Sequence, residues 1–224
     1  GLTGISSTCS NPPPPTVDGT YDCNYGTAGS QGTFTVSGSI VTSNYQCTGA
    51  VVVPDGVTSI GDDAFSGNTG ITSLTLPNSV TRIGSTAFAR ARNLASITFG
   101  TGLTAIGDQA FIEAAGLISI TFPNSLVSIG NSSFFGATNL SAINFGSGLT
   151  SIGPNAFSGA TSLTSMTMPA NLTTIGASAF SGATSLTSLT LNPILQSIGA
   201  NAFSDATSLA SISLPVNLTF LGNA

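Results

Sequence analysis

The feature that most constrains the fold of this chain is a repeat of 23 residues that runs from residue 57 to residue 224. Seven complete copies and the start of an eighth follow one another without an insertion. The copy at residues 149–171, LTSIGPNAFSGATSLTSMTMPAN, shows the shared pattern L-T-x-I-G-x-x-A-F-x-x-A-x-x-L-x-x-I-x-F-P-x-x. One copy is too short to enclose a core, so neighbouring copies must stack, and the repeat predicts a solenoid.

The first half of each copy predicts two turns. The glycine that follows the first isoleucine, as in Ile60-Gly61, predicts a turn with a positive φ, which costs glycine nothing. The A-F pair that comes next, Ala64-Phe65 in the first copy, is too short for an independent helix and predicts one turn of 3₁₀ or α structure. Phenylalanine recurs at the ninth place in all seven copies, which predicts a ladder of rings through the interior.

The second half of each copy predicts a β-strand. In L-x-x-I-x-F the last two apolar residues, such as Ile97 and Phe99, lie two apart, which is the period of a strand. The Pro or Gly that follows, such as Pro77 or Gly100, ends the strand. Stacking the copies places these strands side by side in a parallel sheet.

This pattern resembles the BspA-like leucine-rich repeats, whose coils read L-x-x-I-x-x-x-A-F-x-x-C-x-x-L-x-x-I-x-L-P. The resemblance covers residues 57–224. Where that family often has Cys, this chain has Asn68 in the first copy and Ala in the other six. The resemblance implies a leucine-rich-repeat solenoid with short 3₁₀/α turns and its parallel sheet on the concave side. It also implies a secreted or surface-attached microbial protein with an adhesive or interactive role.

The first 56 residues do not follow the repeat. Residues 1–33 contain a run from Pro12 to Pro15 and are expected to form a Pro-rich linker. Residues 34–56 are expected to form an N-terminal β cap, because two strand-like runs flank a Ser-Gly pair, as in a hairpin, and GAVVVPDG aligns with the strand half of a repeat. Without a cap, the first coil would expose its apolar face and its strand edge.

All three cysteines, Cys9, Cys23 and Cys47, precede the repeats. In an exported protein two of them would pair, and a Cys23–Cys47 disulfide that pins the cap is the expected pairing. Three reduced thiols are the alternative. Isolated cysteines without histidine or a C-x-x-C pair do not make a zinc site, so neither a metal nor a cofactor is expected.

Charged residues make up only 5% of the chain, with three Arg, no Lys, no His and a net charge of -5. This composition argues against nucleic acid as a partner, because binding phosphates requires clustered basic residues. No run of eighteen apolar residues is present, so no membrane insertion is expected. A neutral surface rich in hydroxyl groups favours a secreted or cell-surface location.

Catalysis finds little support in the chain. A serine triad would lack its base, and the acidic residues are scattered over different coils, so no carboxylate pair is indicated. Asp62, Asp63 and Asp108 are expected to lie on a solvated turn rather than to bind a cation. Glu113 lies one period after Arg90, which predicts an ion pair between stacked coils. We therefore expect a non-enzymatic protein.

The candidate binding residues alternate with the inward strand positions and therefore point out of the sheet. They form two files, about 7 Å apart along the strand and about 4.8 Å apart between coils. The candidates are Ser73, Thr75, Ser96, Thr98, Ser119, Thr121, Asn144, Ser165, Thr167, Ser188, Thr190, Ser211 and Ser213. A solvated strand face explains them without a function. The functional alternatives are a binding surface for a protein or glycan, and an array that holds ice-like water.

The last seven residues, LTFLGNA, begin an eighth coil. They predict that the strand of the seventh coil, Ile212 to Leu214, has an unpaired edge, and that Leu218 and Leu221 lie exposed beside it. The first residues, GLTGISST, resemble the strand half of a coil. One hypothesis is a cut within a longer array. The other is a head-to-tail contact between copies that builds a fibre, as an alternative to the binding or adhesion module.

Overall fold

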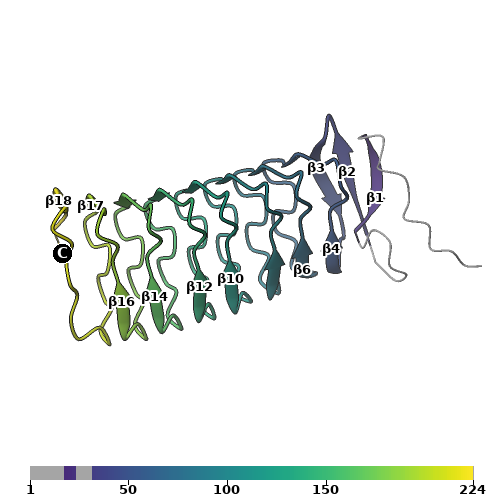
Figure 1. Ribbon diagram of the computed structural model, residues 1–224. Coiled ribbons are helices and arrows are strands. Elements are labelled where there is room, and N and C mark those ends of the chain that lie inside the picture. Colours follow the sequence, from purple (N-terminus) through teal and green to yellow (C-terminus); the bar gives the residue numbers. More distant parts are fainter. Residues whose placement is uncertain (1–17, 24–31, 224) are drawn as a thin grey trace, which may run out of the picture.

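The computed structural model describes residues 18–23 and 32–223. They form an elongated solenoid in which an N-terminal cap is followed by coils stacked along one axis (Figure 1). The expected solenoid of stacked coils with parallel strands is confirmed. The run from Pro12 to Pro15, the segment GLTGISST and Cys9 lie outside the described residues.

The cap consists of three antiparallel strands, β1 (Gly19–Asp22), β2 (Thr33–Ser37) and β3 (Ile40–Tyr45). The β2–β3 hairpin agrees with the expectation from its sequence. Its two turn residues, Gly38 and Ser39, have φ angles of 57° and 65°, as a two-residue hairpin turn that matches the twist of the strands requires. Strand β1 falls inside the segment expected to be a linker, so the cap begins before residue 34.

The Cys23–Cys47 disulfide is present, with 5.6 Å between the two Cα atoms, and both residues are buried. It ties the end of β1 to the end of β3. The cap then leads into β4 (Gly49–Val52), where Val51 and Val53 are buried as the alignment with a repeat predicted.

The second half of the repeat forms the predicted parallel strands. They make two sheets, of three strands in the order β4-β6-β8 and of four strands in the order β10-β12-β14-β16. Paired residues are one period apart, as in Ser119 and Ala142. The further strands are β6 (Ile71–Thr75), β8 (Ser96–Thr98), β10 (Ser119–Thr121), β12 (Ala142–Asn144), β14 (Ser165–Thr167) and β16 (Ser188–Thr190).

A second line of strands, which the sequence did not predict, runs along another side of the solenoid. Each consists of two residues, and most end at the first isoleucine of a repeat. Together with the cap they form an eleven-stranded sheet, β1-β2-β3-β5-β7-β9-β11-β13-β15-β17-β18. The short strands are β5 (Ser59–Ile60), β7 (Arg82–Ile83), β9 (Ala105–Ile106), β11 (Ser128–Ile129), β13 (Ser151–Ile152), β15 (Thr174–Ile175), β17 (Ser197–Ile198) and β18 (Phe220–Leu221).

The predicted positive-φ turn at the glycine after each short strand is wrong, and this glycine instead allows close packing between coils. Among the described residues, no glycine at this place of the repeat has a positive φ. A Cβ atom added to Gly107 would lie 2.7 Å from the carbonyl carbon of Gly84 and 2.8 Å from the amide nitrogen of Ser85. Glycine therefore lets the backbones of neighbouring coils touch, while the positive φ falls two residues later, as at Gln109.

The A-F segment is a turn and not the expected 3₁₀ or α-helical turn, since the described residues contain no helix. Its amides alternate between hydrogen bonds within the coil and hydrogen bonds to the next coil. The Ser66 N–H donates to the Asp63 carbonyl within the coil, whereas the Phe65 N–H donates to the Ala87 carbonyl of the next coil at 2.7 Å. Because every second amide bonds to the neighbouring coil, a helical ladder cannot form.

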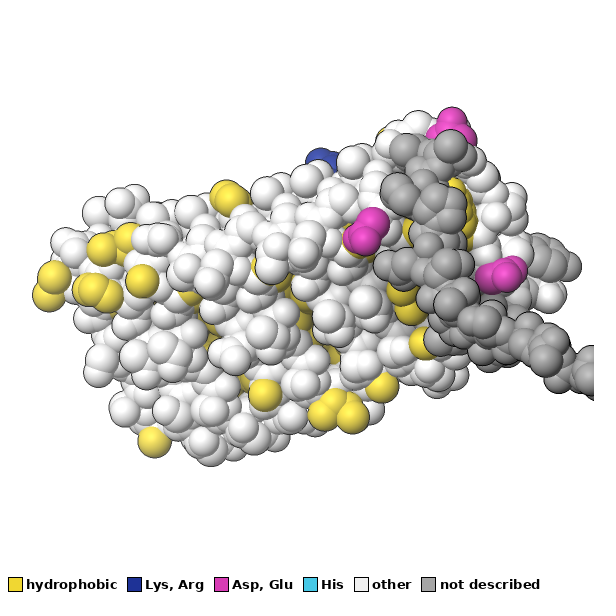
Figure 2. Space-filling model, turned by 45° about the vertical axis from the view of Figure 1, so that its right-hand side comes forward, with side chains coloured by type: hydrophobic (Ala, Val, Ile, Leu, Met, Phe, Trp, Pro, Cys, Tyr) yellow, Lys and Arg dark blue, Asp and Glu magenta, His cyan; other side chains and the backbone are white. Residues whose placement is uncertain are grey.

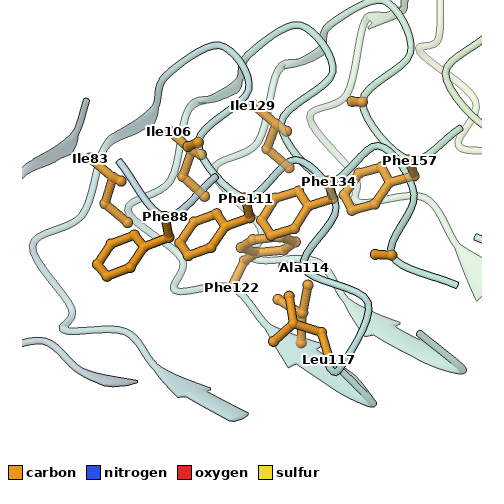
Figure 3. Close-up of a cluster of buried hydrophobic side chains, with 14 of the residues drawn as sticks. Ile83, Phe88, Ile106, Phe111, Ala114, Leu117, Phe122, Ile129, Phe134 and Phe157 are labelled. Atoms are coloured by element: carbon orange, nitrogen blue, oxygen red, sulfur yellow. The ribbon is translucent and has the colours of Figure 1, made fainter. Parts of the chain in front are cut away.

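The ladder of phenylalanine rings is confirmed (Figure 3). Neighbouring ring centroids lie 4.9 to 5.6 Å apart, and the ring planes differ by at most 7°. The rings from Phe65 to Phe180 are fully buried, and Phe203 in the last coil is partly buried. Stacking at this offset adds to the burial of each ring and fixes the register between coils.

The seventh coil differs from the other six. Residues 209–215 form no strand, and Ile212 and Leu214 are 38% and 47% exposed. The predicted strand edge at Ile212 to Leu214 is therefore wrong, and β18 is the last strand within the described residues. Within the described residues, this segment faces a neighbouring coil on one side only, whereas the six preceding strands lie between two neighbours.

Candidate functional site

The outward residues of the longer strands form an uncharged face. On β10, Ser119 and Thr121 are exposed while Ile120 between them is buried, and the same alternation recurs on β12 and β14. The candidates on β6 to β16 take the outward places that the sequence predicted, with Ser73 half-buried. Ser211 and Ser213 are exposed too, but they lie in the irregular segment of the seventh coil.

A shallow hollow of about 620 Å³ lies over part of this face. Ile120, Ile143 and Met166, whose side chains are buried, also line it, and no charged or aromatic residue does. The structure thus brings six of the predicted residues together and leaves the others outside the hollow. The six are Ser119, Thr121, Asn144, Ser165, Thr167 and Ser188.

These six side chains make no hydrogen bond within the described part of the chain. Hydroxyl groups elsewhere in the repeat behave differently. At the second place of the repeat, the Thr104 hydroxyl donates to the Thr81 carbonyl at 2.9 Å, and Thr150 donates to the Val127 carbonyl at 3.1 Å. The hydroxyl groups at the second place hold coils together, whereas those over the hollow make no such bond within the described residues.

Few charged groups are available as alternatives. The predicted ion pair between Arg90 and Glu113 is present, with Arg90 Nε 3.8 Å from the carboxylate, and the Arg92 guanidinium also donates a hydrogen bond to Glu113 at 2.5 Å. The bond from Arg92 lowers the pKa of Glu113. The Asp62 carboxylate accepts the Ser85 amide of the next coil at 2.7 Å. Within the described ranges, no three metal-binding side chains lie together.

The C-terminal end of the described chain is apolar (Figure 2). A hollow of about 340 Å³ there is lined mainly by apolar side chains. Of the predicted assembly residues, Ile212, Leu214 and Leu221 line this hollow, and Leu218 packs partly buried against the core. Val216, which the sequence reasoning did not single out, is 97% exposed.

A third hollow, of about 540 Å³, lies between the cap and the first coil, and the sequence reasoning missed it. Its amides are bonded to one another, because Asn68 donates to the side-chain oxygen of Asn44 at 2.7 Å and Asn44 donates to the Ala64 carbonyl at 2.6 Å. These contacts join the cap to the first coil, which leaves the strand face as the candidate site.

A family model described as the BspA type leucine rich repeat region matches residues 43–140 and 104–224, with six copies. The chain belongs to this family. The BspA-type coils account for the 23-residue register of the hydrogen bonds between neighbouring copies, as between Thr81 and Thr58. No match was found among curated proteins.

Solved structures of leucine-rich-repeat proteins resemble this BspA-type chain. The leucine rich repeat protein of T. pallidum is 28% identical, with a TM-score of 0.70 over 76% of this chain and 82% of that one. A leucine rich cell surface protein of Faecalibacterium prausnitzii is 20% identical, with a TM-score of 0.54 over 88% of this chain and 73% of that one. The pneumococcal vaccine antigen PcpA is 23% identical, with a TM-score of 0.53 over 90% of this chain and 71% of that one. The last two show a shared fold.

The described residues of this BspA-type protein include no helix with the length and hydropathy needed to cross a membrane.

Proposed function

We propose that this protein is a non-enzymatic binding or adhesion module that works outside the cell or at its surface. Its partner, a protein or a glycan, would contact the strand face over β10 to β16. The observation that carries this proposal is the set of six uncharged polar side chains that surround one hollow and have no partner within the described chain. The neutral, lysine-free composition supports the location.

The chemistry of the face indicates a neutral partner. Since no charged side chain lines the hollow, long-range attraction contributes little, and recognition depends on directional hydrogen bonds. Each such bond contributes about 1 kcal/mol net. A useful affinity therefore requires a ligand that reaches several coils at once, such as an extended glycan or a broad protein surface.

A charge-insertion variant tests this proposal. Thr121→Glu together with Thr167→Glu places two carboxylates on the strand face, where both threonines are exposed. The matched control is Thr101→Glu together with Ser147→Glu, two exposed hydroxyl residues on loops outside the hollow. Both pairs would be measured by biolayer interferometry against immobilised neutral glycans and purified extracellular matrix proteins.

We expect saturable binding of the unmodified chain to at least one probe. The face variant should weaken it about tenfold or more, since two buried, unpaired charges cost at least 1.4 kcal/mol together, and the loop control should leave it unchanged. Absence of binding to every probe would contradict the proposal. Equal weakening by both variants would show that the strand face is not the site.

A second candidate function is self-association through the C-terminal end. The observation that favours it is the exposure of Ile212, Leu214, Val216 and Leu221, a surface that a further coil of this chain or of another copy would cover. Sedimentation velocity should then show association that rises with concentration. Ile212→Glu with Leu214→Glu should abolish it, while Ile118→Glu with Val127→Glu, at two exposed apolar residues away from this end, should not.

Ice binding gains no support from the strand face. A match to an ice lattice requires evenly spaced hydroxyl groups, but the strand ladder stops at β8 and begins again at β10. A measurement of thermal hysteresis should therefore show no activity.

A further inference from the structure

The strand side of the solenoid is bonded unevenly from coil to coil. Coils one to seven are residues 57–79, 80–102, 103–125, 126–148, 149–171, 172–194 and 195–217. In coils one, three and five, the amide after the strand donates to the next coil at 2.8 or 2.9 Å. These bonds are Leu76 to Thr98, Phe122 to Asn144 and Met168 to Thr190. The equivalent amides of coils two, four and six, Phe99, Phe145 and Leu191, make no such bond within the described residues.

Strand pairing follows the same alternation. β6 pairs with β8, β10 with β12, and β14 with β16, each over three residue pairs. In contrast, β12 and β14 pair only between Ala142 and Ser165, and no pairing links β8 to β10. Figure 1 shows a wider interval between β12 and β14 than between β10 and β12. We call the junctions after coils one, three and five closed, and those after coils two, four and six open.

The loops that follow the strands explain the closed junctions after coils one and three, whereas at the junction after coil five the Asn192 side chain donates to the Pro169 carbonyl. A Cβ atom on Gly100 would overlap the carbonyl of Pro77, so the glycine loop of coil two nests against the proline loop of coil one. The Asn78 side chain then accepts the Thr101 amide at 2.8 Å. The same nesting joins coils three and four, where Asn124 accepts the Ser147 amide at 3.0 Å.

At the open junctions after coils two and four a proline loop follows a glycine loop, and this nesting is lost. In these loops, the junction between coils four and five retains one side-chain bond, from Asn171 to the Ser147 carbonyl at 2.9 Å. Burial of the inward strand residues reflects the difference. Leu76 and Phe122 are buried, whereas Phe99 and Phe145, which face open junctions, are only partly buried.

The other two sides of the coil are bonded equally at both kinds of junction. Along the turns, the Phe88 amide crosses an open junction and the Phe111 amide crosses a closed one, each with a hydrogen bond of 2.7 Å. Along the short strands, Gly107 and Gly130 donate to the preceding coil at 2.9 Å in both cases. Among the described residues, the strand side of the junction between coils four and five keeps only the Ala142–Ser165 pairing, the Asn171 bond and a long backbone bond of 3.4 Å from Thr164 to Ser141. An open junction is therefore firmly attached on two sides and weakly attached on the third, which is the arrangement of a hinge.

We infer that the solenoid flexes as rigid pairs of coils, which part at the strand face of the open junctions while the sheet of short strands acts as the hinge. The hollow over β10 to β16 spans the open junction between β12 and β14. Flexing there changes the curvature of the candidate binding face, so the face can adapt to a partner in steps of two coils. The inference concerns the free protein and stands independently of the proposed function.

Residue-resolved amide hydrogen exchange on the whole chain, without ligand, tests the hinge. The Phe99 and Phe145 amides should exchange at least about tenfold faster than those of Leu76 and Phe122, the effect expected of one missing bond and easier local opening. The Phe88 and Phe111 amides should be equally protected. Equal protection of Phe99 and Leu76 would overturn the hinge, and so would exchange of Phe88 as fast as Phe99, because the coils would then separate completely.

A pair of variants gives a second test. Asn124→Ala removes the side chain that accepts a hydrogen bond from the Ser147 amide at a closed junction, and Asn171→Ala removes the side chain that donates one to the Ser147 carbonyl at an open junction. The first should speed exchange of the Phe122 amide about fivefold or more, and the second should leave it unchanged. The opposite pattern, or no response to either variant, would contradict the pairing of coils. Unfolding midpoints of both variants confirm that the chain remains folded.

Discussion

Ser133 is the one residue that breaks a file of buried alanines. It occupies the place before the ladder phenylalanine, where the neighbouring coils have Ala110 and Ala156. Its side chain is fully buried, and its hydroxyl has no hydrogen-bond partner among the described residues. A buried hydroxyl without a partner costs desolvation energy and gains nothing in return.

Ser133→Ala is therefore expected to stabilise the protein by about 1 kcal/mol, because it removes an unsatisfied group at a place that alanine already fits. Urea unfolding monitored by circular dichroism measures the change. Ser119→Ala serves as the control, because the Ser119 side chain is exposed and makes no hydrogen bond within the described residues. Its unfolding free energy should stay within about 0.5 kcal/mol of that of the unmodified chain. A destabilised Ser133→Ala would point to an unseen partner for the hydroxyl.

Glu113 gives a prediction about pH. Its pKa is lowered by the hydrogen bond from Arg92, with smaller electrostatic contributions from Arg92 and Arg90. The ion pair therefore adds stability above the pKa of glutamate in the unfolded chain, and this is lost as the pH falls through the lower folded value. An NMR titration should find the midpoint of Glu113 below the ordinary range. Arg92→Ala should raise it, and Arg82→Ala should leave it unchanged.

At the scale of single elements, the phenylalanine ladder contributes a buried contact between each coil and the next. Phe134 lies in its middle, fully buried between two rings, whereas Phe203 at the C-terminal end has one ring neighbour and is partly buried. Phe134→Ala should cost about 4 kcal/mol of unfolding free energy, and Phe203→Ala distinctly less. Guanidinium unfolding of the two variants measures both losses of unfolding free energy. Equal losses would show that a ring between two stacked neighbours is no more important to stability than a ring with one.

The elements differ in how far the sequence predicts them. The longer strands and the ladder follow from apolar residues at fixed places, since each place either faces the core or does not. The short strands escape prediction because two residues, such as Ala105 and Ile106, cannot show the alternation of a strand. The glycine beside them gives a misleading signal, because a need for contact and a need for positive φ select the same residue.

The candidate site was predictable in part. Alternation with buried residues such as Ile120 identifies the outward hydroxyl groups, but it does not separate free hydroxyl groups from bonded ones. That difference depends on whether a carbonyl of the preceding coil lies within reach, as it does for Thr104 and does not for Thr121. The extent of the hollow likewise depends on pairing between coils, which a single repeat does not show.

At the scale of the whole molecule, the disulfide links the stability of the cap to redox conditions. Cys23 and Cys47 close a loop with a sequence separation of 24, and removing such a cross-link costs about 3 kcal/mol through the entropy of the unfolded chain. Reduction should therefore lower the unfolding temperature and expose the cap amides to exchange before those of the ladder. The Cys23→Ser, Cys47→Ser double variant should not respond to reductant, and a response would implicate another group.

The alternation of closed and open junctions also bears on how such a chain changes length over generations. Deleting coils three and four would bring the glycine loop of coil two against the proline loop of coil five, which restores a junction of the kind already present. Deleting coil three alone would bring two glycine loops together, without the proline partner that each now has. In-frame losses and duplications of a pair of coils should therefore be tolerated more readily than those of a single coil, and the unit of inheritance would be twice the unit of repetition.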